Sequence, residues 1–455
     1  MRRSTLFVTL ALATIAARPS LMQTPSPAPA PAPAPAPASN PTNLGNDANG
    51  NPLRRALKTG HISNYDESKV APYTLANPLV MANGTRVTSA RTWTRQRRPE
   101  LLRLYAAHIY GRVPGNAPTV RWEVAETDAH ARDGAALLKK VVGHVGPKAD
   151  GPQIRVSVYT PAQATKKVPI ILLMNFGGGP ARAGAPPAAP AGRAGQGRGN
   201  AATGEPPNAA DILARGWGYA TVGYNDIQPD RQDAWTEGVI GQTLAPGQTK
   251  PAPDEWGTIS AWAWGASRIA DYLQSDRNVD GSRLALYGFS RLGKTVLWAA
   301  AQDDRFTVVF SGCAGEMGSA LARRDWGETV DDMAQNFPWQ FSESFQQWPG
   351  RWSAMPVDAH MLIALLAPRP LFVTGGTGDQ WSDPKGEFLA QVAAGPVYRL
   401  LGARDLGTTT YPAPDTPVVT GDLGFNLHTG PHTATPGEWA LFVDFLSRYF
   451  TATKS

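Results

Sequence analysis

The sequence predicts an open α/β sheet that is doubly wound, mostly parallel and covered by helices on both faces. Short continuous apolar runs, typical of strands buried on both faces, recur along the chain. Amphipathic helical patterns separate several of these runs, and alternation of strands with helices favours a parallel sheet. Apolar residues make up 42% of the 455 residues and charged residues 18%, so the chain can form a large core.

The first 20 residues have the pattern of a secretory signal peptide. Arg2 and Arg3 precede an apolar run over residues 6–17 that is rich in small side chains. This run is too short to span a membrane comfortably. No cysteine follows it, which argues against a lipoprotein anchor. We therefore expect residues 1–20 to direct the protein to the periplasm or the medium, without a membrane anchor.

Residues 21–60 are predicted to be a disordered, Pro/Ala-rich linker. Residues 24–42 consist almost entirely of alternating Pro and Ala. Because proline fixes φ and removes backbone donors, this stretch favours an extended spacer. Residues 43–60 are polar and are expected to lack structure. A single folded domain is then expected over residues 61–455.

The folded part is predicted to begin with a helix over residues 98–111, in which apolar side chains recur at three- and four-residue spacing. Pro99 suits the first turn of that helix, where its missing N–H costs nothing. Two stretches of alternating apolar and polar residues follow, at 120–124 and 153–159, and are typical of antiparallel strands. Residues 168–174 are continuously apolar and predict a buried strand.

A loop insertion is expected at residues 180–208, directly after this strand. The segment is rich in Ala, Gly, Pro and Arg and has no periodicity. We interpret it as a surface loop; the alternative is that it shapes access to a pocket at the end of the strand.

Buried strands and helices alternate through the rest of the chain. The strands are predicted from short apolar runs and the helices from apolar residues at helical spacing. The predicted strands are residues 219–224, 284–287, 307–311 and 370–374, and the predicted helices are residues 259–273, 292–302 and 437–449.

Composition disfavours several kinds of site. The chain has one cysteine, Cys313, so neither an internal disulfide, a thiolate zinc site nor an iron–sulfur cluster can be built. The seven histidines are scattered and form no His-Glu-x-x-His motif, so neither a metal nor a cofactor is expected. The net charge is +6, but no basic run or stripe predicts nucleic-acid binding.

Residues 284–295, Leu-Ala-Leu-Tyr-Gly-Phe-Ser-Arg-Leu-Gly-Lys-Thr, fit two incompatible chemistries. Gly288 and Gly293-Lys-Thr satisfy the phosphate-loop pattern G-x-x-x-x-G-K-[ST]. The alternative is a nucleophile elbow, in which a strand ends in a sharp turn at Ser290 and a helix follows. The phosphate loop is disfavoured because bulky residues stand between its glycines and at least two buried strands precede it. Its exported location would also offer no ATP.

A serine hydroxyl becomes a nucleophile when a base takes its proton and an acid orients that base. In α/β-hydrolases these partners follow in the order serine, acid, histidine. Asp379 follows the strand predicted at 370–374, and His432 precedes the last helix, with His428 as its rival. Both loops lie where open α/β sheets form their sites. The predicted fold is therefore an α/β-hydrolase, a three-layer sandwich, with a triad of Ser290, His432 and Asp379.

The elbow departs from G-x-S-x-G, because Leu292 takes the second glycine position and Gly293 comes one residue later. Gly-x-Ser-Arg-x-Gly-Lys resembles the signature of the glucuronoyl esterases of bacterial type, carbohydrate esterase family fifteen. The resemblance extends over residues 61–450. Its other matching stretches are Tyr-Asp-Glu-Ser-Lys-Val (65–70), Arg-Arg-Pro-Glu-Leu-Leu (97–102), Ile-Tyr-Gly-Arg-Val-Pro (109–114), Trp-Gly-Thr-Ile-Ser-Ala-Trp-Ala-Trp-Gly (256–265), Gln-Asp-Asp-Arg-Phe (302–306), Gly-Glu-Thr-Val (327–330), Leu-Leu-Ala-Pro-Arg-Pro (365–370) and Trp-Ser-Asp-Pro-Lys-Gly-Glu-Phe-Leu (381–389).

The resemblance implies further roles. Arg291 matches the oxyanion arginine of the family, and Lys294, Glu328 and Trp381 match residues that contact the sugar. Residues 175–179, Asn-Phe-Gly-Gly-Gly, lie where α/β-hydrolases build the second side of the oxyanion pocket.

The acid of the triad differs among members of this family. Some use a Glu after the strand that follows the nucleophile helix, some an acid at the Asp379 place, and some carry both. The Glu place is Cys313 in this sequence. Asp379 is therefore the expected acid, and Glu316 and Asp383 are its rivals.

The resemblance implies a carboxylic ester hydrolase of the 4-O-methyl-glucuronoyl methylesterase type that needs no cofactor. The expected substrate is the C6 ester of glucuronic or 4-O-methylglucuronic acid, as in a fragment of glucuronoxylan linked to lignin. The reaction would pass through a glucuronoyl-enzyme intermediate. The alternatives are another carbohydrate esterase on the same scaffold, such as an acetyl esterase, or a non-catalytic glycan-binding protein. The protein is expected to be a monomer.

Overall fold

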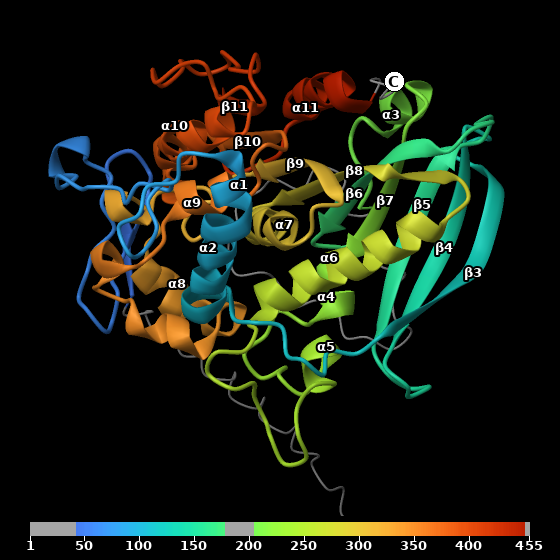
Figure 1. The fold of residues 1–455 in the computed structure, drawn as a ribbon, viewed down its shortest axis with the longest axis horizontal. Helices are drawn as coiled ribbons and strands as arrows, with labels where there is room; N and C mark the ends of the chain where they lie inside the picture. The colour runs from blue at the N-terminus through green and yellow to red at the C-terminus, as the bar shows by residue number, and fades with distance from the viewer. Residues whose placement is uncertain (1–41, 178–203, 451–455) are drawn as a thin grey trace, which may run out of the picture. The chain divides into compact units, whose positions relative to one another are not determined.

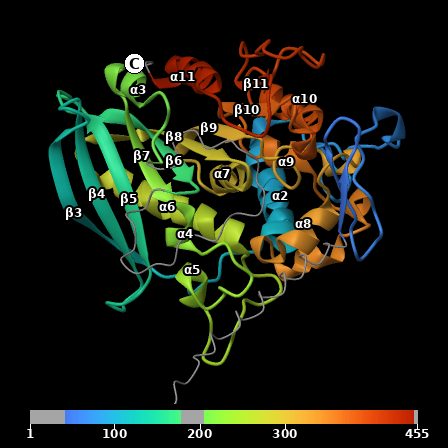
Figure 2. The same ribbon diagram turned by 180° about the vertical axis from the view of Figure 1, so that it is seen from behind.

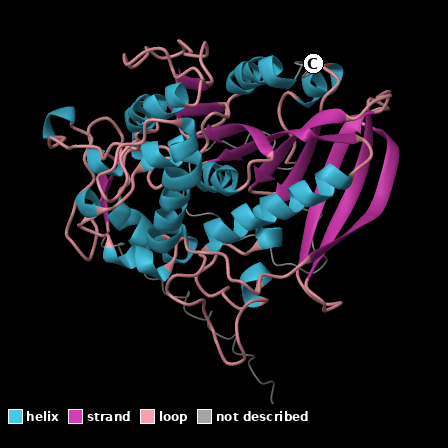
Figure 3. Cartoon of the chain, viewed as in Figure 1, coloured by secondary structure: helices cyan, strands magenta, loops and turns pink. Residues whose placement is uncertain are grey.

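The computed structural model describes residues 42–177 and 204–450. Within these residues nine strands form one sheet in the order β11-β10-β9-β8-β6-β7-β5-β4-β3, drawn as arrows in Figure 1 and in magenta in Figure 3. Neighbours from β11 to β7 run parallel, and β5, β4 and β3 continue the sheet in antiparallel pairs. The predicted mostly parallel α/β sheet is confirmed.

The predicted strands and helices are all present among the described residues, with shifted ends. The strands of the sheet are β3 (Val120–Ala131), β4 (Ala136–Val145), β5 (Gln153–Pro161), β6 (Val168–Asn175), β7 (Gly218–Gly223), β8 (Val279–Phe289), β9 (Phe306–Gly312), β10 (Leu371–Gly376) and β11 (Leu423–His428). The helices are α1 (Ala90–Thr92), α2 (Arg98–Tyr105), α3 (Ala209–Ala214), α4 (Tyr224–Ile227), α5 (Gly238–Gly241), α6 (Thr258–Ser275), α7 (Arg291–Gln302), α8 (Val330–Asn336), α9 (Ala359–Ala364), α10 (Pro384–Leu400) and α11 (Pro436–Phe450). The helix expected over 98–111 is α2, prolonged by a wider π-helical turn, Ala106–Tyr110.

Helices cover both faces of the sheet and make the expected three layers. α6 and α7 pack on one face, and α3 and α11 on the other, as Figure 1 and the reverse view in Figure 2 show. Side chains alternate along a strand, so Ile170 and Leu172 of β6 enter one core and Ile171 and Leu173 the other. This is why β6 reads as a continuous apolar run.

The prediction that residues 43–60 lack structure is wrong. β1 (Asn43–Asn46) and β2 (Pro52–Arg54) pair as a two-stranded antiparallel sheet. The N–H of Leu57 donates to the side chain of Gln335 at 2.6 Å, and the Thr59 hydroxyl donates to Asp331. Hydrogen bonds to distant residues, rather than apolar burial, hold this segment, so a polar composition does not indicate disorder here.

Three predictions fall on residues outside the described part of the chain. They are the signal peptide at 1–20, the Pro-Ala stretch as far as residue 41, and the insertion as far as residue 203. Within the ranges that are described, no helix is both long enough and apolar enough to cross a bilayer.

The turn between β8 and α7 needs two glycines. A Cβ on Gly288 would lie 2.1 Å from the carbonyl oxygen of Leu292, so any larger residue would collide with the backbone of the helix. A Cβ on Gly293 would lie 2.9 Å from the Cβ of Ala314, so this glycine lets α7 approach the segment after β9. Gly293 is therefore a close contact of the helix, and both glycines serve an elbow.

The sheet changes direction between β6 and β8. From β6 the chain moves outward to β7, and it then returns to place β8 on the other side of β6, with β9, β10 and β11 following outward. Such a switch point leaves a crevice at the carboxyl ends of the strands, where open α/β sheets bind ligands. Ser290 follows β8 at this point, and Asn175 ends the neighbouring β6.

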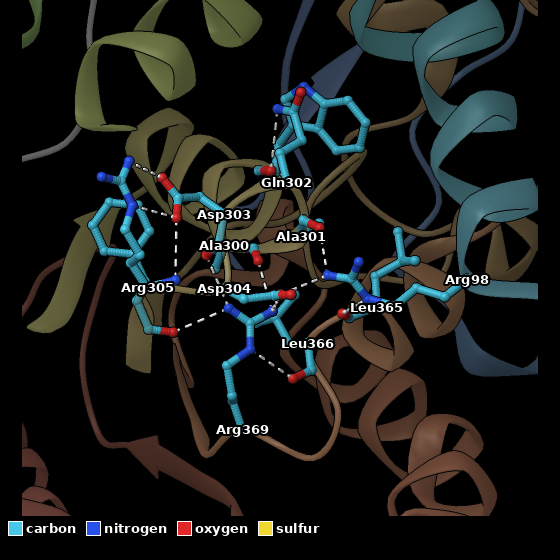
Figure 4. Close-up of polar contacts among 12 residues, drawn as sticks. Arg98, Ala300, Ala301, Gln302, Asp303, Asp304, Arg305, Leu365, Leu366 and Arg369 are labelled. Atoms are coloured by element: carbon cyan, nitrogen blue, oxygen red, sulfur yellow. Dashed lines mark hydrogen bonds and ion pairs between the residues drawn. The ribbon is translucent and has the colours of Figure 1, made fainter. Parts of the chain in front are cut away.

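Two arginines hold the far end of α7, as Figure 4 shows. Arg369 donates to the carbonyls of Ala300, Asp303, Phe306 and Leu366 at distances from 2.6 to 3.2 Å. Arg98 donates to the carbonyl of Ala301 (2.8 Å) and to that of Leu365 (3.3 Å). The carbonyls at a helix C-terminus lack partners within the helix, and these guanidinium groups supply them. Three of the stretches that carry the family resemblance, 97–102, 302–306 and 365–370, therefore meet in one structural anchor.

Replacing Arg369 with alanine is expected to lower the free energy of unfolding by about 2–3 kcal/mol, because carbonyls lose a charged donor. Urea denaturation measures this loss, and kcat/KM of the folded variant should stay within about twofold of wild type, since such a change is only a few tenths of a kcal/mol. The control is Arg404→Ala, which removes a side chain that is 64% exposed. An equal stability change in both variants would contradict the anchoring role.

Candidate active site

Ser290 occupies the turn between β8 and α7 with φ of 57° and ψ of −127°, a sparsely populated conformation for a residue with a side chain. Its N–H donates to the carbonyl of Gly312 (2.7 Å), and its carbonyl accepts from the N–H of Lys294 (3.2 Å). The first bond joins Ser290 to the end of the neighbouring strand β9 and the second to the first turn of α7, and together they hold the strained conformation. Ser290 is partly exposed, as the nucleophile of an elbow must be.

Asp379 and His432 lie within hydrogen-bond distance of each other. Oδ2 of Asp379, in the loop after β10, is 2.6 Å from Nδ1 of His432, in the loop after β11. The Asp379 side chain is 4% exposed and the imidazole 22%. A proton on Nδ1 donates to the carboxylate and leaves Nε2 free to accept one. The ring of Phe289, next to Ser290, lies 4.7 Å from the imidazole by centroids and places the histidine beside the elbow.

His428, the rival base, has both ring nitrogens engaged elsewhere. Nδ1 lies 2.7 Å from Oε1 of Glu438, and Nε2 lies 2.9 Å from the carbonyl oxygen of Pro431. Burial opposes the charged imidazole, but the hydrogen bond to Glu438 and the charge of that carboxylate outweigh burial and raise the pKa of His428. His428 therefore fastens the loop that carries His432, and it has no lone pair available for a substrate proton.

Neither of the two rival acids takes the place of Asp379 beside His432. Asp383 accepts from Nε of Arg324 (3.0 Å) and from the N–H of Gly386 (2.9 Å), which makes it the N-cap of α10. Glu316 is buried, and burial together with nearby carboxylates raises its pKa well above the usual range. Neither carboxylate has a hydrogen bond to His432 among the described residues, whereas Asp379 does.

Cys313 lies beside the His432–Asp379 pair. Its Sγ, a carboxylate oxygen of Asp379 and a ring nitrogen of His432 all lie within 4.8 Å of one another. Burial, reinforced by the neighbouring carboxylates, raises the pKa of the Cys313 thiol, so it does not supply a thiolate. The three atoms also fit a metal poorly, because 2.6 Å is a hydrogen-bond distance and two ligands at about 2.0–2.1 Å from a tetrahedral zinc ion would be about 3.3 Å apart.

Lys294, Glu328 and Trp381 lie together in the structure. Nε1 of Trp381 donates to Oε1 of Glu328 at 2.9 Å, and Nζ of Lys294 lies 3.7 Å from Oε2 of the same carboxylate. Lys294 stands one helical turn beyond Ser290. Burial lowers the pKa of the Lys294 ammonium and raises the pKa of the Glu328 carboxyl, and each group's charge partly restores the other. The pair offers a dehydrated donor and acceptor to a polar ligand.

Arg291 contacts a carboxylate that the sequence did not indicate. Its Nη1 donates to Oδ2 of Asp230, whose side chain is 5% exposed. The guanidinium carbon lies 5.2 Å from the ring centroid of Phe337 and 6.0 Å from that of Phe176. Asp230 belongs to no motif, and only the fold brings it to Arg291.

The strand β6 ends beside this arginine. Asn175 donates through its side-chain amide to the carbonyl of Gly204, and Phe176 meets the ring of Tyr224 edge-on at 5.5 Å. Gly178 and Gly179 of the predicted oxyanion segment lie outside the described residues. Gly177 is thus the last described residue on this side of the crevice.

The doubly wound sheet and its strained serine turn define the class of protein, an α/β-hydrolase with a nucleophile elbow. Comparison with known proteins narrows this class. A family model described as "Glucuronyl esterase, fungi" matches residues 251–402. The carbohydrate esterase MZ0003, from an unknown prokaryotic organism, is 39% identical over 405 residues, which are 85% of this chain and 92% of that protein.

Two solved structures share the fold of this chain over most of its length. A glucuronoyl esterase from Solibacter usitatus is 40% identical with a TM-score of 0.76, over 84% of this chain and 99% of its own. A structure described as a promiscuous CE15 esterase from a marine bacterial metagenome is 36% identical with a TM-score of 0.74, over 85% and 100%. The chain belongs to the glucuronoyl esterases, carbohydrate esterase family fifteen.

Proposed function

We propose that the chain is a serine esterase that hydrolyses the C6 ester of glucuronic acid or 4-O-methylglucuronic acid. One observation carries the serine chemistry: the 2.6 Å bond between His432 and Asp379, beside an elbow serine. The acyl part of the substrate rests on family membership, since relatives along the whole domain are named glucuronoyl esterases. The expected alcohols range from methanol to a benzyl alcohol of the lignin type.

Acylation of the enzyme uses the three triad residues. Oγ of Ser290 attacks the ester carbonyl while Nε2 of His432 takes the hydroxyl proton. Asp379 holds Nδ1–H and stabilises the imidazolium that forms. The same Nε2 proton then passes to the departing alcohol, and a glucuronoyl ester of Ser290 remains. Water, activated by His432, hydrolyses that ester and restores the enzyme.

Two donors are proposed for the oxyanion that develops in both steps. The backbone N–H of Arg291 directly follows the nucleophile, which is the usual first donor of an elbow enzyme. The Arg291 guanidinium is the second proposed donor, and its positive charge would stabilise the oxyanion. Such preorganised donors are often the largest contribution to catalysis, because they need not reorganise as charge develops.

The sugar is bound by the network of Lys294, Glu328 and Trp381. The Glu328 carboxylate can accept from hydroxyls of the pyranose, the Lys294 ammonium can donate to them, and the indole of Trp381 lies against the ring. All three are held by one another before the substrate arrives. A site built to bind hydroxyls discriminates strongly against ligands that lack them, because its buried polar groups would be left without partners.

Replacing Glu328 with glutamine is expected to lower kcat/KM for methyl glucuronate by about 10- to 100-fold, mostly through KM, because a hydrogen bond to a charged group is lost. Turnover of a simple acetate ester should be unchanged. The matched control is Glu343→Gln, which removes an exposed carboxylate paired with Lys250. Steady-state kinetics of both variants on both esters provide the measurement, and a parallel loss on acetate would contradict a sugar-binding role.

A substrate panel tests the proposed function. The alcohol is kept as benzyl alcohol, and the acyl part is glucuronate, galacturonate or acetate. We expect the highest kcat/KM for glucuronate. Preference for acetate would reject the glucuronoyl assignment, and absence of turnover on all three would reject the esterase altogether.

A broader carbohydrate esterase is the second candidate. It is favoured by the structural relative described as a promiscuous CE15 esterase. In the panel this candidate predicts similar kcat/KM values for glucuronate and acetate.

We further propose that residues 1–20 are a signal peptide and that the enzyme acts outside the cytoplasm as a monomer on fragments of glucuronoxylan linked to lignin. The catalytic domain is proposed to begin at about residue 42, since β1 and β2 pack with it, within the ordinary size range of large α/β domains. Mass spectrometry of the exported protein would locate its N-terminus.

A further inference from the structure

Several hydrogen-bond donors surround the carboxylate of Asp230. It lies between α4 and α5, and its N–H donates to the side chain of Asn225 at 2.9 Å. Its Oδ1 accepts from Nε1 of Trp339 (2.7 Å) and from Nε2 of Gln340 (2.9 Å). Its Oδ2 faces Nη1 of Arg291, with the hydroxyl of Tyr224 at 3.4 Å. Each carboxylate oxygen therefore has its own set of partners.

The two neutral donors, Trp339 and Gln340, determine which carboxylate oxygen of Asp230 accepts from Arg291. Because Trp339 and Gln340 hold Oδ1, the carboxylate cannot turn, and Oδ2 stays aimed at the guanidinium. The loop itself is fastened by Gln228, which is fully buried and bonds to the carbonyl of Ala234 and the N–H of Ile240. A carboxylate so rigid is suited to orient another group.

Within the part of the chain that the structure describes, several N–H groups of the Arg291 guanidinium have no partner. Its rotation is limited by the rings of Phe176 and Phe337 and by Asp230. Among the described residues its side chain makes no further hydrogen bond, although a guanidinium carries five N–H groups. The remaining N–H groups are available to a substrate at the elbow, where the arginine begins α7.

We propose that Asp230 is a positioning residue for this esterase: it holds the Arg291 guanidinium where negative charge develops on the substrate carbonyl oxygen. The proposal rests on the proposed esterase function and adds a residue that acts through Arg291 without touching the substrate. A long arginine side chain is otherwise free to point into solvent, and preorganisation is what makes an oxyanion donor effective.

The test is a double-mutant cycle with Asp230→Asn and Arg291→Ala, measured on the best ester of the substrate panel. Asp230→Asn is expected to lower kcat about 10- to 100-fold, somewhat less than the loss of a whole oxyanion donor, with KM within about threefold. In the Arg291→Ala background the same substitution should change kcat by less than about twofold, because the group that Asp230 orients is gone. Losses that multiply in the double variant would overturn the proposal, and so would an unchanged kcat in Asp230→Asn.

Two further variants guard against a merely structural effect. Asp303→Asn is the matched control, since Asp303 accepts from Arg305 at the opposite end of α7 and is buried to a similar degree. It should leave kcat unchanged. Trp339→Phe keeps every charge and frees Oδ1 in part, so it should lower kcat about two- to tenfold. If Asp230→Asn does not fold, the cycle is run with Trp339→Phe, and additivity with Arg291→Ala again rejects the proposal.

The result of this double-mutant cycle can be distinguished from the result of the substrate panel that tests the proposed function. The glucuronate preference is judged from the acyl panel in the wild type. The cycle compares variants on whichever ester is cleaved best, so it reports on Asp230 even if that ester is an acetate.

Discussion

Replacing Ser290 with alanine is expected to lower kcat on a glucuronate ester by about 10⁴- to 10⁶-fold while KM changes little, because the nucleophile is lost and the binding groups remain. The strained φ of 57° at this position belongs to the backbone, and alanine can occupy it as serine does. Ester hydrolysis followed by product chromatography measures the loss over the range required.

The control for this variant is Ser282→Ala. Ser282 lies at the other end of β8, where its hydroxyl donates to Asp280 at the surface. Its kcat should equal that of wild type. Activity of Ser290→Ala within about tenfold of wild type would contradict its role as the nucleophile, since loss of a triad serine costs far more in enzymes of this kind.

Replacing Asp379 with asparagine is expected to lower kcat by about 10³- to 10⁴-fold, because an amide cannot stabilise the imidazolium and favours the wrong tautomer of His432. The variants Glu316→Gln and Asp383→Asn separate this carboxylate from its rivals. Asp383→Asn should lower the melting temperature through the cap of α10 but retain most of the activity. A larger loss of kcat in Glu316→Gln than in Asp379→Asn would contradict the assignment of the acid.

Cys313 offers a rescue of the same variant. Its Sγ lies within 4.8 Å of a carboxylate oxygen of Asp379 and of a ring nitrogen of His432, so a carboxylate placed there could reach the imidazole. The double variant Asp379→Asn/Cys313→Glu is expected to recover at least about tenfold of the lost kcat, as one charge-assisted hydrogen bond returns. Cys313→Gln in the same background is the matched control and should recover none.

Strands whose two faces are both buried could be predicted, and those held by polar contacts could not. β6 and β9 consist mainly of apolar residues because each face meets its own core. The apolar pattern of β4 is interrupted by Lys139, whose ammonium pairs with the buried Asp276 at 2.6 Å. β11 is fully buried yet contains Asn426 and His428, the latter neutralised by Glu438. A pattern of apolar residues cannot reveal such compensation.

The site shows the same division. Ser290 and Lys294 are close in sequence, and one helical turn relates them, so a motif describes both. Asp379 and His432 follow the ends of neighbouring strands, which made their meeting predictable in outline. No sequence pattern indicated Asp230, because the groups that donate hydrogen bonds to it belong to residues 6 to 110 positions away along the chain. Only the folded chain shows that such a residue belongs to the site.

Helix α7 combines support and chemistry. Its first turn carries Arg291 and Lys294, which face the proposed oxyanion and sugar sites. Its last carbonyls are fixed by Arg369 and Arg98, as seen in Figure 4. Helix α7 therefore begins at a strained turn and is anchored at its other end. This is consistent with a preorganised site that keeps its geometry during turnover.

The central claim is that hydrolysis passes through a glucuronoyl ester of Ser290, and partitioning between water and added methanol tests it most directly. Esters of glucuronate with different alcohols would be cleaved by the wild-type enzyme at one fixed methanol concentration, and the ratio of methyl glucuronate to free glucuronate would be measured. A common acyl-enzyme predicts the same ratio for every leaving alcohol, since each alcohol has departed before the products are decided. A ratio that changes with the leaving alcohol would contradict the acyl-enzyme and indicate direct attack by water.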